Sequence, residues 1–346
     1  MKSHTQNRGP GCAAARALLV AGILGAALMA RPAGAATYLF PVADSLPSEI
    51  RHRLAPGDTL LVPSGARRVS VALVSGITVR GQGSMDAVIF TPERTESPIF
   101  FFLPGKDTTR VENITFDCSS DHDATALYFS NAVMSVRGNR FVGGYAIKAD
   151  SSSGLIVENS FDAPKSAVRC TMSSIWIDRN DIIGATGGAI SMRGSPLRIT
   201  RNRIVQNVNT GIVISGKRFA PVIGGEPGMG NEIHGGFNSD VATTGGKTIN
   251  AQYNYWGIRT TEEMNQLGYP ANITAFTDGW DQGKAAGKVD YRNWLDRAGG
   301  QPVKMRKRAA GRVAPGQAAV AAVVIGALAV AGGVLRARRR RPSGAT

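Results

Sequence analysis

Apolar and polar residues recur along the chain with a period of 20 to 22 residues. The repeated pattern is an aliphatic residue, two variable residues, Asn, one variable residue, and then Phe or Ile. A second, alternating segment recurs with the same period, as in Ala146–Ala149 and Ala167–Cys170. Two strand patterns that share one period indicate that each period is one coil of a solenoid, in which equivalent strands stack in parallel about 4.8 Å apart.

Alternation within the second segment predicts which side chains face the core, because successive side chains of a strand point to opposite faces. One inward row comprises Ile147, Val168, Ile190 and Ile212. The corresponding outward row comprises Lys148, Arg169, Ser191 and Val213. The solenoid is therefore expected to present two cations on consecutive coils.

The recurring asparagines form a column at a bend between strands. Its members are Asn139, Asn159, Asn180 and Asn202. Asparagine tolerates a left-handed backbone, and its short side chain bonds readily to nearby main chain. We interpret the column as a structural feature that joins consecutive coils, rather than as a ligand-binding one.

Segments on both sides of the coils complete the pattern. Leu46, Ile50 and Leu54 lie four residues apart within Asp44–Leu54, which predicts a helix that caps the first coil. The chain from residue 37 to 296 resembles right-handed parallel β-helix proteins of the pectate-lyase-like superfamily. The resemblance rests on this helix followed by PGDTLLVPSG, the strand ITVRGQGS, the asparagine-marked coils and the closing NYWG. It implies an all-β fold, a single-stranded right-handed parallel β-helix of seven to nine coils with an N-terminal cap helix.

Both ends of the chain are predicted to direct export and anchoring. Residues 1–35 combine a basic start, an apolar stretch and a small-residue end, which is typical of a secretory signal peptide. Residues 297–316 form a basic linker, residues 317–335 are apolar enough for a transmembrane helix, and residues 336–346 form an arginine-rich cytoplasmic tail. The tail resembles bacterial C-terminal sorting signals, but Val313–Gly316 replaces the usual processing motif, so processing is left open. We expect an exported, surface- or membrane-anchored protein that crosses the membrane once.

The formal net charge of +15 does not indicate a nucleic-acid partner. Residues 1–35 contain four Lys or Arg, residues 297–346 contain eleven, and neither segment contains an acid. The remaining 25 basic residues balance the 25 acidic ones, so the repeat region is neutral. Binding to nucleic acid is therefore not expected.

The sequence contains no complete catalytic signature of the superfamily it resembles. Its pectate lyases use several carboxylates for Ca²⁺ with an arginine base, and its polygalacturonases use paired Asp with Gly-His-Gly. Neither an Asp-Asp pair nor a Gly-His-Gly occurs here. Asp117, Asp121 and Asp123 form the densest acidic segment and are weak candidates for Ca²⁺, because a twelve-residue calcium loop is missing. We expect no cofactor apart from this weak Ca²⁺ site, and the sequence leaves catalysis undecided.

A cationic ladder is the best candidate for ligand binding. Lys148 and Arg169 share an outward position, and Arg193 lies near the next coil. Cations spaced at the rise of one coil suit the carboxylates of an acidic polysaccharide. The alternative is a solvated face, balanced by the carboxylates of Asp150, Asp178 and Asp181.

Three functions remain open at this stage. The first is binding or modification of envelope or extracellular polysaccharide, as a lyase or glycoside hydrolase if catalytic. The second is a non-catalytic adhesin or scaffold. The third follows from a similarity to the periplasmic copper-handling β-helix proteins of nitrous oxide reductase maturation, whose paired His and Met ligands are not evident here.

The predicted topology can be tested on intact cells. If residues 37–296 lie outside the membrane, externally added protease should degrade them while the envelope is whole. A cytoplasmic protein in the same cells serves as the control and should survive. Protection of the repeat region until the cytoplasm is opened would contradict the interpretation of both ends.

Overall fold

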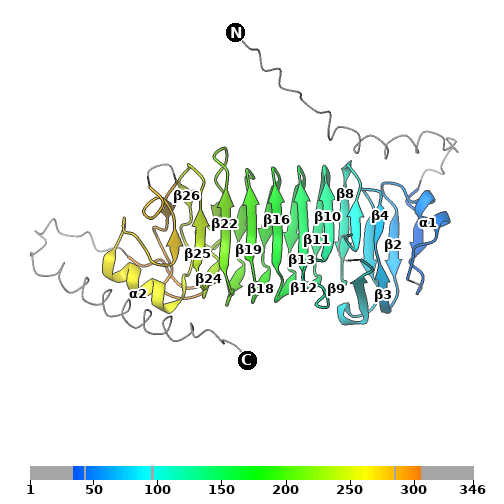
Figure 1. The fold of residues 1–346 in the computed structure, drawn as a ribbon, viewed down its shortest axis with the longest axis horizontal. Helices are drawn as coiled ribbons and strands as arrows, with labels where there is room; N and C mark the ends of the chain where they lie inside the picture. The colour runs from blue at the N-terminus through cyan, green and yellow to red at the C-terminus, as the bar shows by residue number, and fades with distance from the viewer. Residues whose placement is uncertain (1–33, 43, 95–96, 284–285, 305–346) are drawn as a thin grey trace, which may run out of the picture.

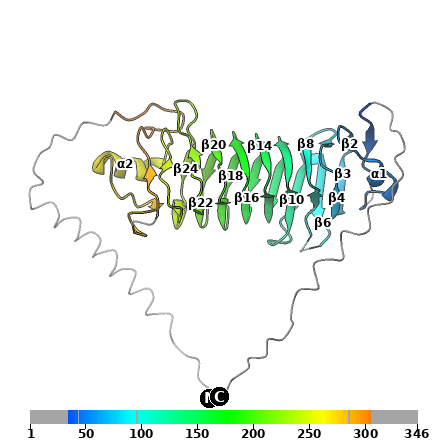
Figure 2. The same ribbon diagram turned by 90° about the horizontal axis from the view of Figure 1, so that it is seen from above.

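The computed structural model describes residues 34–42, 44–94, 97–283 and 286–304, which cover the repeat region and its closing segment. Consecutive coils pair in parallel and build three long sheets. Figures 1 and 2 show the strands stacked side by side along the long axis, with α1 (Ser48–Arg53) beyond the first coil and α2 (Gly257–Leu267) at the other end. The predicted parallel β-solenoid is confirmed, with about eight coils.

The three sheets contain most of the ordered structure. The eleven-stranded sheet comprises β1 (Thr37–Leu39), β2 (Thr59–Val62), β5 (Thr78–Gly81), β8 (Gly105–Glu112), β11 (Ala132–Arg137), β14 (Ser153–Val157), β17 (Ser174–Asp178), β20 (Arg198–Thr200), β23 (Val222–Ile223), β26 (Ile249–Asn250) and β28 (Val289–Asp290). The eight-stranded sheet comprises β3 (Gly65–Val69), β6 (Val88–Pro92), β9 (Thr115–Cys118), β12 (Arg140–Gly143), β15 (Ser160–Asp162), β18 (Asp181–Ile183), β21 (Arg203–Val205) and β24 (Glu232–His234). The nine-stranded sheet comprises β4 (Val71–Leu73), β7 (Phe100–Phe102), β10 (Thr125–Ser130), β13 (Tyr145–Asp150), β16 (Ser166–Thr171), β19 (Gly188–Arg193), β22 (Thr210–Ser215), β25 (Ser239–Thr243) and β27 (Phe276–Thr277). A short 3₁₀ helix, η1 (Met85–Ala87), precedes β6.

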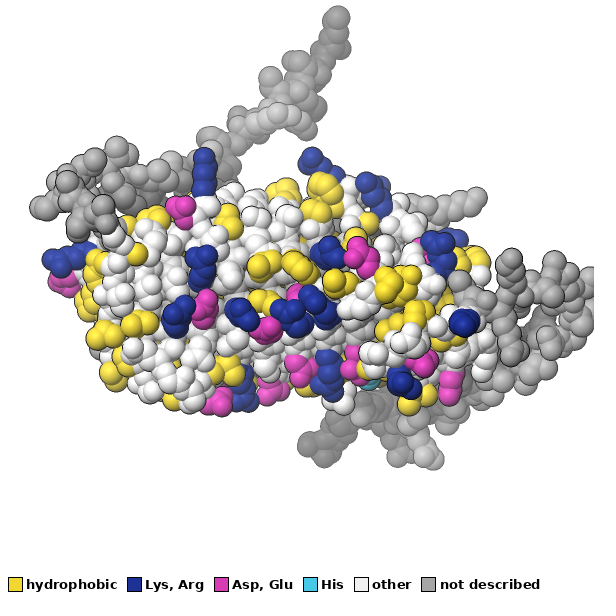
Figure 3. All heavy atoms as spheres, turned by 180° about the vertical axis from the view of Figure 1, so that it is seen from behind, with side chains coloured by type: hydrophobic (Ala, Val, Ile, Leu, Met, Phe, Trp, Pro, Cys, Tyr) yellow, Lys and Arg dark blue, Asp and Glu magenta, His cyan; other side chains and the backbone are white. Residues whose placement is uncertain are grey.

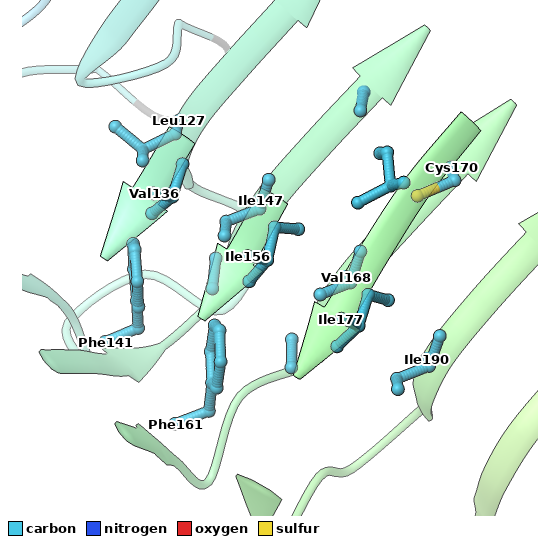
Figure 4. Packing of buried hydrophobic residues seen from close by; sticks show 14 of the residues in the cluster. Leu127, Val136, Phe141, Ile147, Ile156, Phe161, Val168, Cys170, Ile177 and Ile190 are labelled. Carbon is cyan, nitrogen blue, oxygen red and sulfur yellow. The ribbon is translucent and has the colours of Figure 1, made fainter. Parts of the chain in front are cut away.

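Side chains of equal type stack inside the solenoid, because each coil repeats the register of the one before. Phe116, Phe141 and Phe161 lie parallel, with ring centroids 5.1 and 4.9 Å apart. The inward row predicted from alternation is buried throughout, and Figure 4 shows it running from coil to coil. The core is therefore one continuous apolar column rather than a set of separate clusters.

The asparagine column is a buried hydrogen-bonded ladder. The side chain of Asn180 accepts from the main-chain N–H of Asn159 at 2.9 Å and donates to the carbonyl of Ile156 at 2.9 Å. Its Nδ2 also donates to the Oδ1 of Asn202 at 2.9 Å, and the same contacts recur along the column. The ladder continues beyond the four predicted members to Asn231 and Asn254.

The backbone expectation for this column was wrong in one respect. The left-handed residue is the one before each asparagine, namely Gly138, Glu158, Arg179 and Arg201, with φ between 51° and 61°. The sharp bend therefore comes one residue early, and the asparagine that follows can turn its side chain into the stack. Asparagine is selected here by its hydrogen bonds and not by its backbone preference.

The outer surface carries mixed charge. Figure 3 shows basic and acidic side chains interspersed over one face. Glu158 binds Arg137 and Arg179 from the two neighbouring coils at 2.8 and 3.0 Å. Exposed pairs of this kind contribute little each, so the packed interior and the ladder dominate stability.

The helices and the chain ends differ in part from expectation. Helix α1 begins at Ser48 instead of near Asp44, because Pro47 precedes it in an extended conformation. No helix of the described residues is long and apolar enough to span a membrane. The predicted transmembrane segment (residues 317–335), and the signal peptide apart from its last two residues, lie outside the described residues.

Removing one rung of the ladder should destabilise the whole stack. Asn180→Ala leaves the N–H of Asn159 and the carbonyl of Ile156 buried without partners, at a cost of about 2–4 kcal/mol. Denaturant unfolding followed by circular dichroism measures this loss. The exposed Asn272→Ala should change stability by less than about 0.5 kcal/mol. Equal stability of both variants would show that the ladder does not contribute strongly to the free energy of unfolding.

Candidate functional site

The nine-stranded sheet aligns three large polar side chains on its outer face. Tyr128 of β10 is in register with Lys148 of β13, which is in register with Arg169 of β16. All three alternate with buried neighbours and therefore point outward. The next coils carry the small Ser191 and the apolar Val213 at this position, so the row of large polar side chains ends after three coils.

These residues surround a depression that we call the cationic hollow. Its volume is about 370 Å³. The hollow is lined by Pro98, Thr125, Tyr128, Lys148, Asp150, Arg169 and Thr171. Its walls come from four consecutive coils, those of β7, β10, β13 and β16, so its shape depends on their register.

Positive charge gathers around one aromatic ring beside the hollow. The Nζ of Lys148 lies 4.1 Å from the ring centroid of Tyr145, and the Nζ of Lys165 lies 5.0 Å from it. The Cζ of Arg169 is 5.8 Å from the same centroid. The negative face of the ring attracts cations and partly offsets their mutual repulsion.

Two of these cations have no carboxylate partner among the described residues. Lys165 pairs with Asp123 at 2.5 Å, but Lys148 and Arg169 form no such ion pair. Burial lowers the pKa of Lys148, and the positive charges of Arg169 and Lys165 lower it further. The depressed pKa of Lys148 therefore reflects burial first and the neighbouring positive charges second, while Asp123 and Asp150 oppose it.

The carboxylate that lines the hollow is already engaged. Tyr128 donates its hydroxyl proton to Asp150 Oδ2 at 2.7 Å. Burial raises the pKa of Tyr128 to about 12, and the hydrogen bond to Asp150 contributes to the rise. Asp150 is thus held toward Tyr128 and does not form an ion pair with Lys148.

An aromatic surface adjoins the cationic hollow. The rings of Phe101 and Tyr128 lie 5.2 Å apart on neighbouring strands. They line a second depression of about 330 Å³, which shares Pro98 and Tyr128 with the first. Cations and flat apolar rings therefore follow one another along the same face of the sheet.

The remaining predicted residues lie elsewhere. Arg193 is in register with Thr171, is exposed, and does not line the hollow. Two of the three carboxylates expected to balance the ladder lie in the other sheets, where Asp178 binds Arg201 at 2.7 Å and Asp181 binds Arg203 at 3.0 Å.

The weak calcium candidates make other contacts in this structure. Asp123 pairs with Lys165, while Asp117 and Asp121 accept main-chain N–H groups of their own loop. Within the described residues no group of three His, Cys, Asp or Glu side chains is arranged to hold a metal ion.

Sequence reasoning missed the aromatic members of the site. Tyr128 lies 20 residues before Lys148, so extending the outward row one coil back would have found it. Phe101 lies 27 residues before Tyr128, because a longer coil precedes β10, and the regular period does not reach it. Tyr145 stands at the start of its strand, where alternation gives no rule.

Comparison with known proteins adds architecture alone. No family model matches the chain, and no curated protein matches it. Three solved structures are similar to this chain, each at 11% identity. The first, "Geobacillus virus E2 - ORF18", has a TM-score of 0.41, and the match covers 69% of this chain and 53% of that one. The other two each have a TM-score of 0.34 and match 72% of this chain: an iota-carrageenase of family GH82 from A. fortis, covered to 65%, and a 1,3-α-1,4-β-D-galactose-4-sulfate-3,6-anhydro-D-galactose-2-sulfate 4 galactohydrolase, covered to 64%. The chain spans between about half and two thirds of their lengths. Likeness at this level concerns the β-solenoid and carries no argument about activity.

The Tyr128–Asp150 hydrogen bond can be tested by titration. A carboxylate disfavours tyrosinate, so Asp150→Asn should lower the pKa of Tyr128 from about 12 toward the ordinary value near 10. Spectrophotometric titration of tyrosinate measures the shift, and Tyr128→Phe identifies the residue by removing its contribution. Identical titration curves for the native protein and Asp150→Asn would show that the two groups are not coupled.

Proposed function

We propose that this protein binds an acidic polysaccharide through the cationic hollow. The observation that carries the proposal is a pair of cations, Lys148 and Arg169, that lie on consecutive coils of one exposed sheet without an ion-pair partner among the described residues. Like charges at the spacing of one coil, about 4.8 Å, repel each other. An anionic ligand relieves that repulsion and forms charge-assisted hydrogen bonds with both groups.

The surroundings favour a sugar polymer over other anions. Only a few cations gather at this site, and the repeat region is neutral as a whole, which does not suit nucleic acid. Phe101 and Tyr128 offer flat apolar rings next to the charges, a combination that suits the faces and carboxylates or sulfates of an acidic sugar chain. The open sheet face supports a linear ligand along the solenoid axis.

The location of the protein is part of the proposal. An apolar N-terminal segment with a basic start and an apolar C-terminal segment followed by arginines support export and anchoring, with residues 37–296 outside the membrane. An envelope or extracellular glycan would then be the accessible ligand.

We further propose that the coils wind right-handed and that α1 caps the first coil. The capping role of α1 is supported by the burial of Leu46 and Leu54, which lie on either side of this helix.

A charge-matched pair of double variants tests the binding site. Lys148→Ser with Arg169→Ser should weaken binding of polygalacturonate, alginate or a sulfated galactan at least tenfold at low salt, since one hydrogen bond to a charged group contributes about 1.5–3 kcal/mol. Lys106→Ser with Arg110→Ser removes the same charge from exposed positions of β8 and should leave affinity nearly unchanged. Calorimetry at two salt concentrations provides the measurement, and the difference between the variants should shrink at high salt.

Two outcomes separate the competing functions. Equal affinity of the two double variants at low salt would show that the cationic hollow is a solvated surface and not a binding site. That result would favour an adhesin or scaffold with another ligand. Assaying each bound polymer for new unsaturated or reducing ends, with and without Ca²⁺, distinguishes binding from cleavage.

A further inference from the structure

A second hollow opens at the C-terminal end of the solenoid, where β24, β25 and α2 meet. Its volume is about 440 Å³, within the range of about 300–1,000 Å³ typical of small-molecule sites. Its walls are the turn between β24 and β25, the first turn of α2, and Thr274 with Ala275. Figures 1 and 2 show α2 at this end, and it contacts β24. We call this depression the end hollow.

A buried acid interrupts a row of small residues at this point. The equivalent positions in the five preceding coils are Ala126, Ala146, Ala167, Ala189 and Gly211. The same position in β25 is Asp240, a residue that is only 4% exposed. Coil geometry does not require an acid here, because alanine fills the position elsewhere, and burying a carboxylate has a free-energy cost. Asp240 therefore has a use other than packing.

The carboxylate of Asp240 is held on one side and available on the other. Its Oδ1 accepts the N–H of Gly236 at 3.0 Å, and its Oδ2 has no hydrogen-bond partner among the described residues. Asp240 also lines the hollow, so this second oxygen is the acceptor that a ligand there could use. Burial raises the pKa of Asp240 to about 6, while the Gly236 N–H and the nearby His234 oppose the rise.

Two glycines allow the walls to approach. A Cβ on Gly236 would lie 2.2 Å from the carbonyl oxygen of Ser239. A Cβ on Gly257 would lie 2.7 Å from the Cβ of His234, and its φ of +74° is itself unfavourable for other residues. The hollow thus depends on specific backbone contacts on two sides.

The rim of the end hollow is apolar. Phe237 is 86% exposed and Ile258 is 72% exposed, the two highest values among the large hydrophobic side chains of the described residues. Both residues line this hollow. An exposed aromatic ring beside a polar floor is suited to a ligand with one apolar face and several hydroxyl groups.

The charges of the end hollow largely compensate one another. The lining groups that carry or acquire charge are His234, Asp240 and Arg259. His234 is paired with Glu232 at 2.9 Å, and Arg259 is exposed without an ion pair to another described residue. Uncharged donors and acceptors from Asn238, Ser239, Thr260 and Thr274 complete the lining. A neutral ligand suits this balance better than an anion or a metal ion.

We infer that the end hollow binds one neutral hexose unit, with the ring stacked on Phe237 and hydroxyl groups bonded to Asp240 and Arg259. This inference does not rest on the acidic-polysaccharide proposal. The two hollows share no residue, and β19 and β22 separate their strands.

Methyl glucosides, galactosides and mannosides provide a defined set of probes for the full chain. Saturation-transfer NMR should detect at least one of them, and calorimetry then gives its affinity. Phe237→Ala should weaken that sugar roughly tenfold through loss of stacking and buried area. Met172→Ala, a matched truncation of another exposed apolar side chain, should leave affinity unchanged.

The pH dependence identifies the acid. Ionised Asp240 accepts hydroxyl hydrogen bonds more strongly than the protonated form, so affinity should rise as the pH increases through about 6. Asp240→Asn should abolish that rise. His234→Gln should retain it, which separates the two titratable groups that line the hollow.

Three results would overturn the inference. The first is the absence of a signal from all the neutral hexosides, and the second is an equal affinity of Phe237→Ala and Met172→Ala. The third is concentration-dependent self-association that Phe237→Ala abolishes, which would assign the end hollow to a second copy of the chain. None of these results depends on the binding of acidic polymers, so the two proposals fail independently.

Discussion

Hydrogen bonding between coils is the constraint on which the rest of this structure depends. A single coil cannot satisfy its own main-chain groups, so each strand pairs with its equivalents above and below. The asparagine ladder extends the same requirement to the bends, where its side chains replace missing main-chain partners. Once this register is set, every outward side chain has a fixed neighbour one coil away. Tyr128, Lys148 and Arg169 are brought together by this register and not by any local preference of their own.

The fold could be predicted from the sequence because two strand patterns in each coil recur with the same period. The inward rows and the four regular asparagines followed directly from spacing. Asn231 and Asn254 were not among the predicted members, since the coil before Asn231 is 29 residues long and breaks the period, yet both occupy the same ladder. The left-handed position was misplaced by one residue, because sequence preference does not distinguish a residue that makes a bend from one that fills it. Helix α1 is shorter than the spacing of Leu46, Ile50 and Leu54 predicts, since it begins at Ser48, after Pro47.

The candidate sites were predictable only where a column is regular. Lys148 and Arg169 were found because they share a repeat position, whereas Tyr145 stands at a strand end and Asp240 replaces an alanine after a long insertion. Arg193 was assigned to the same surface from proximity in sequence, but its register places it one column away. In a solenoid the residue that breaks a column is as informative as the residue that repeats, and comparing each position with its equivalents would have identified Asp240.

The long coil between Asn202 and Asn231 has a consequence for how such a molecule can change during evolution. Its extra residues, including the glycine-rich Gly224–Gly230, lie outside the ladder and leave the register intact. Added chain is therefore accommodated at loops, whereas duplication or loss of a whole coil changes the length of the stack. Gain or loss of a coil between the cationic hollow and the end hollow would change their separation by one step of about 4.8 Å. The distance between two recognition surfaces on this scaffold can thus change during evolution only in steps of one whole coil.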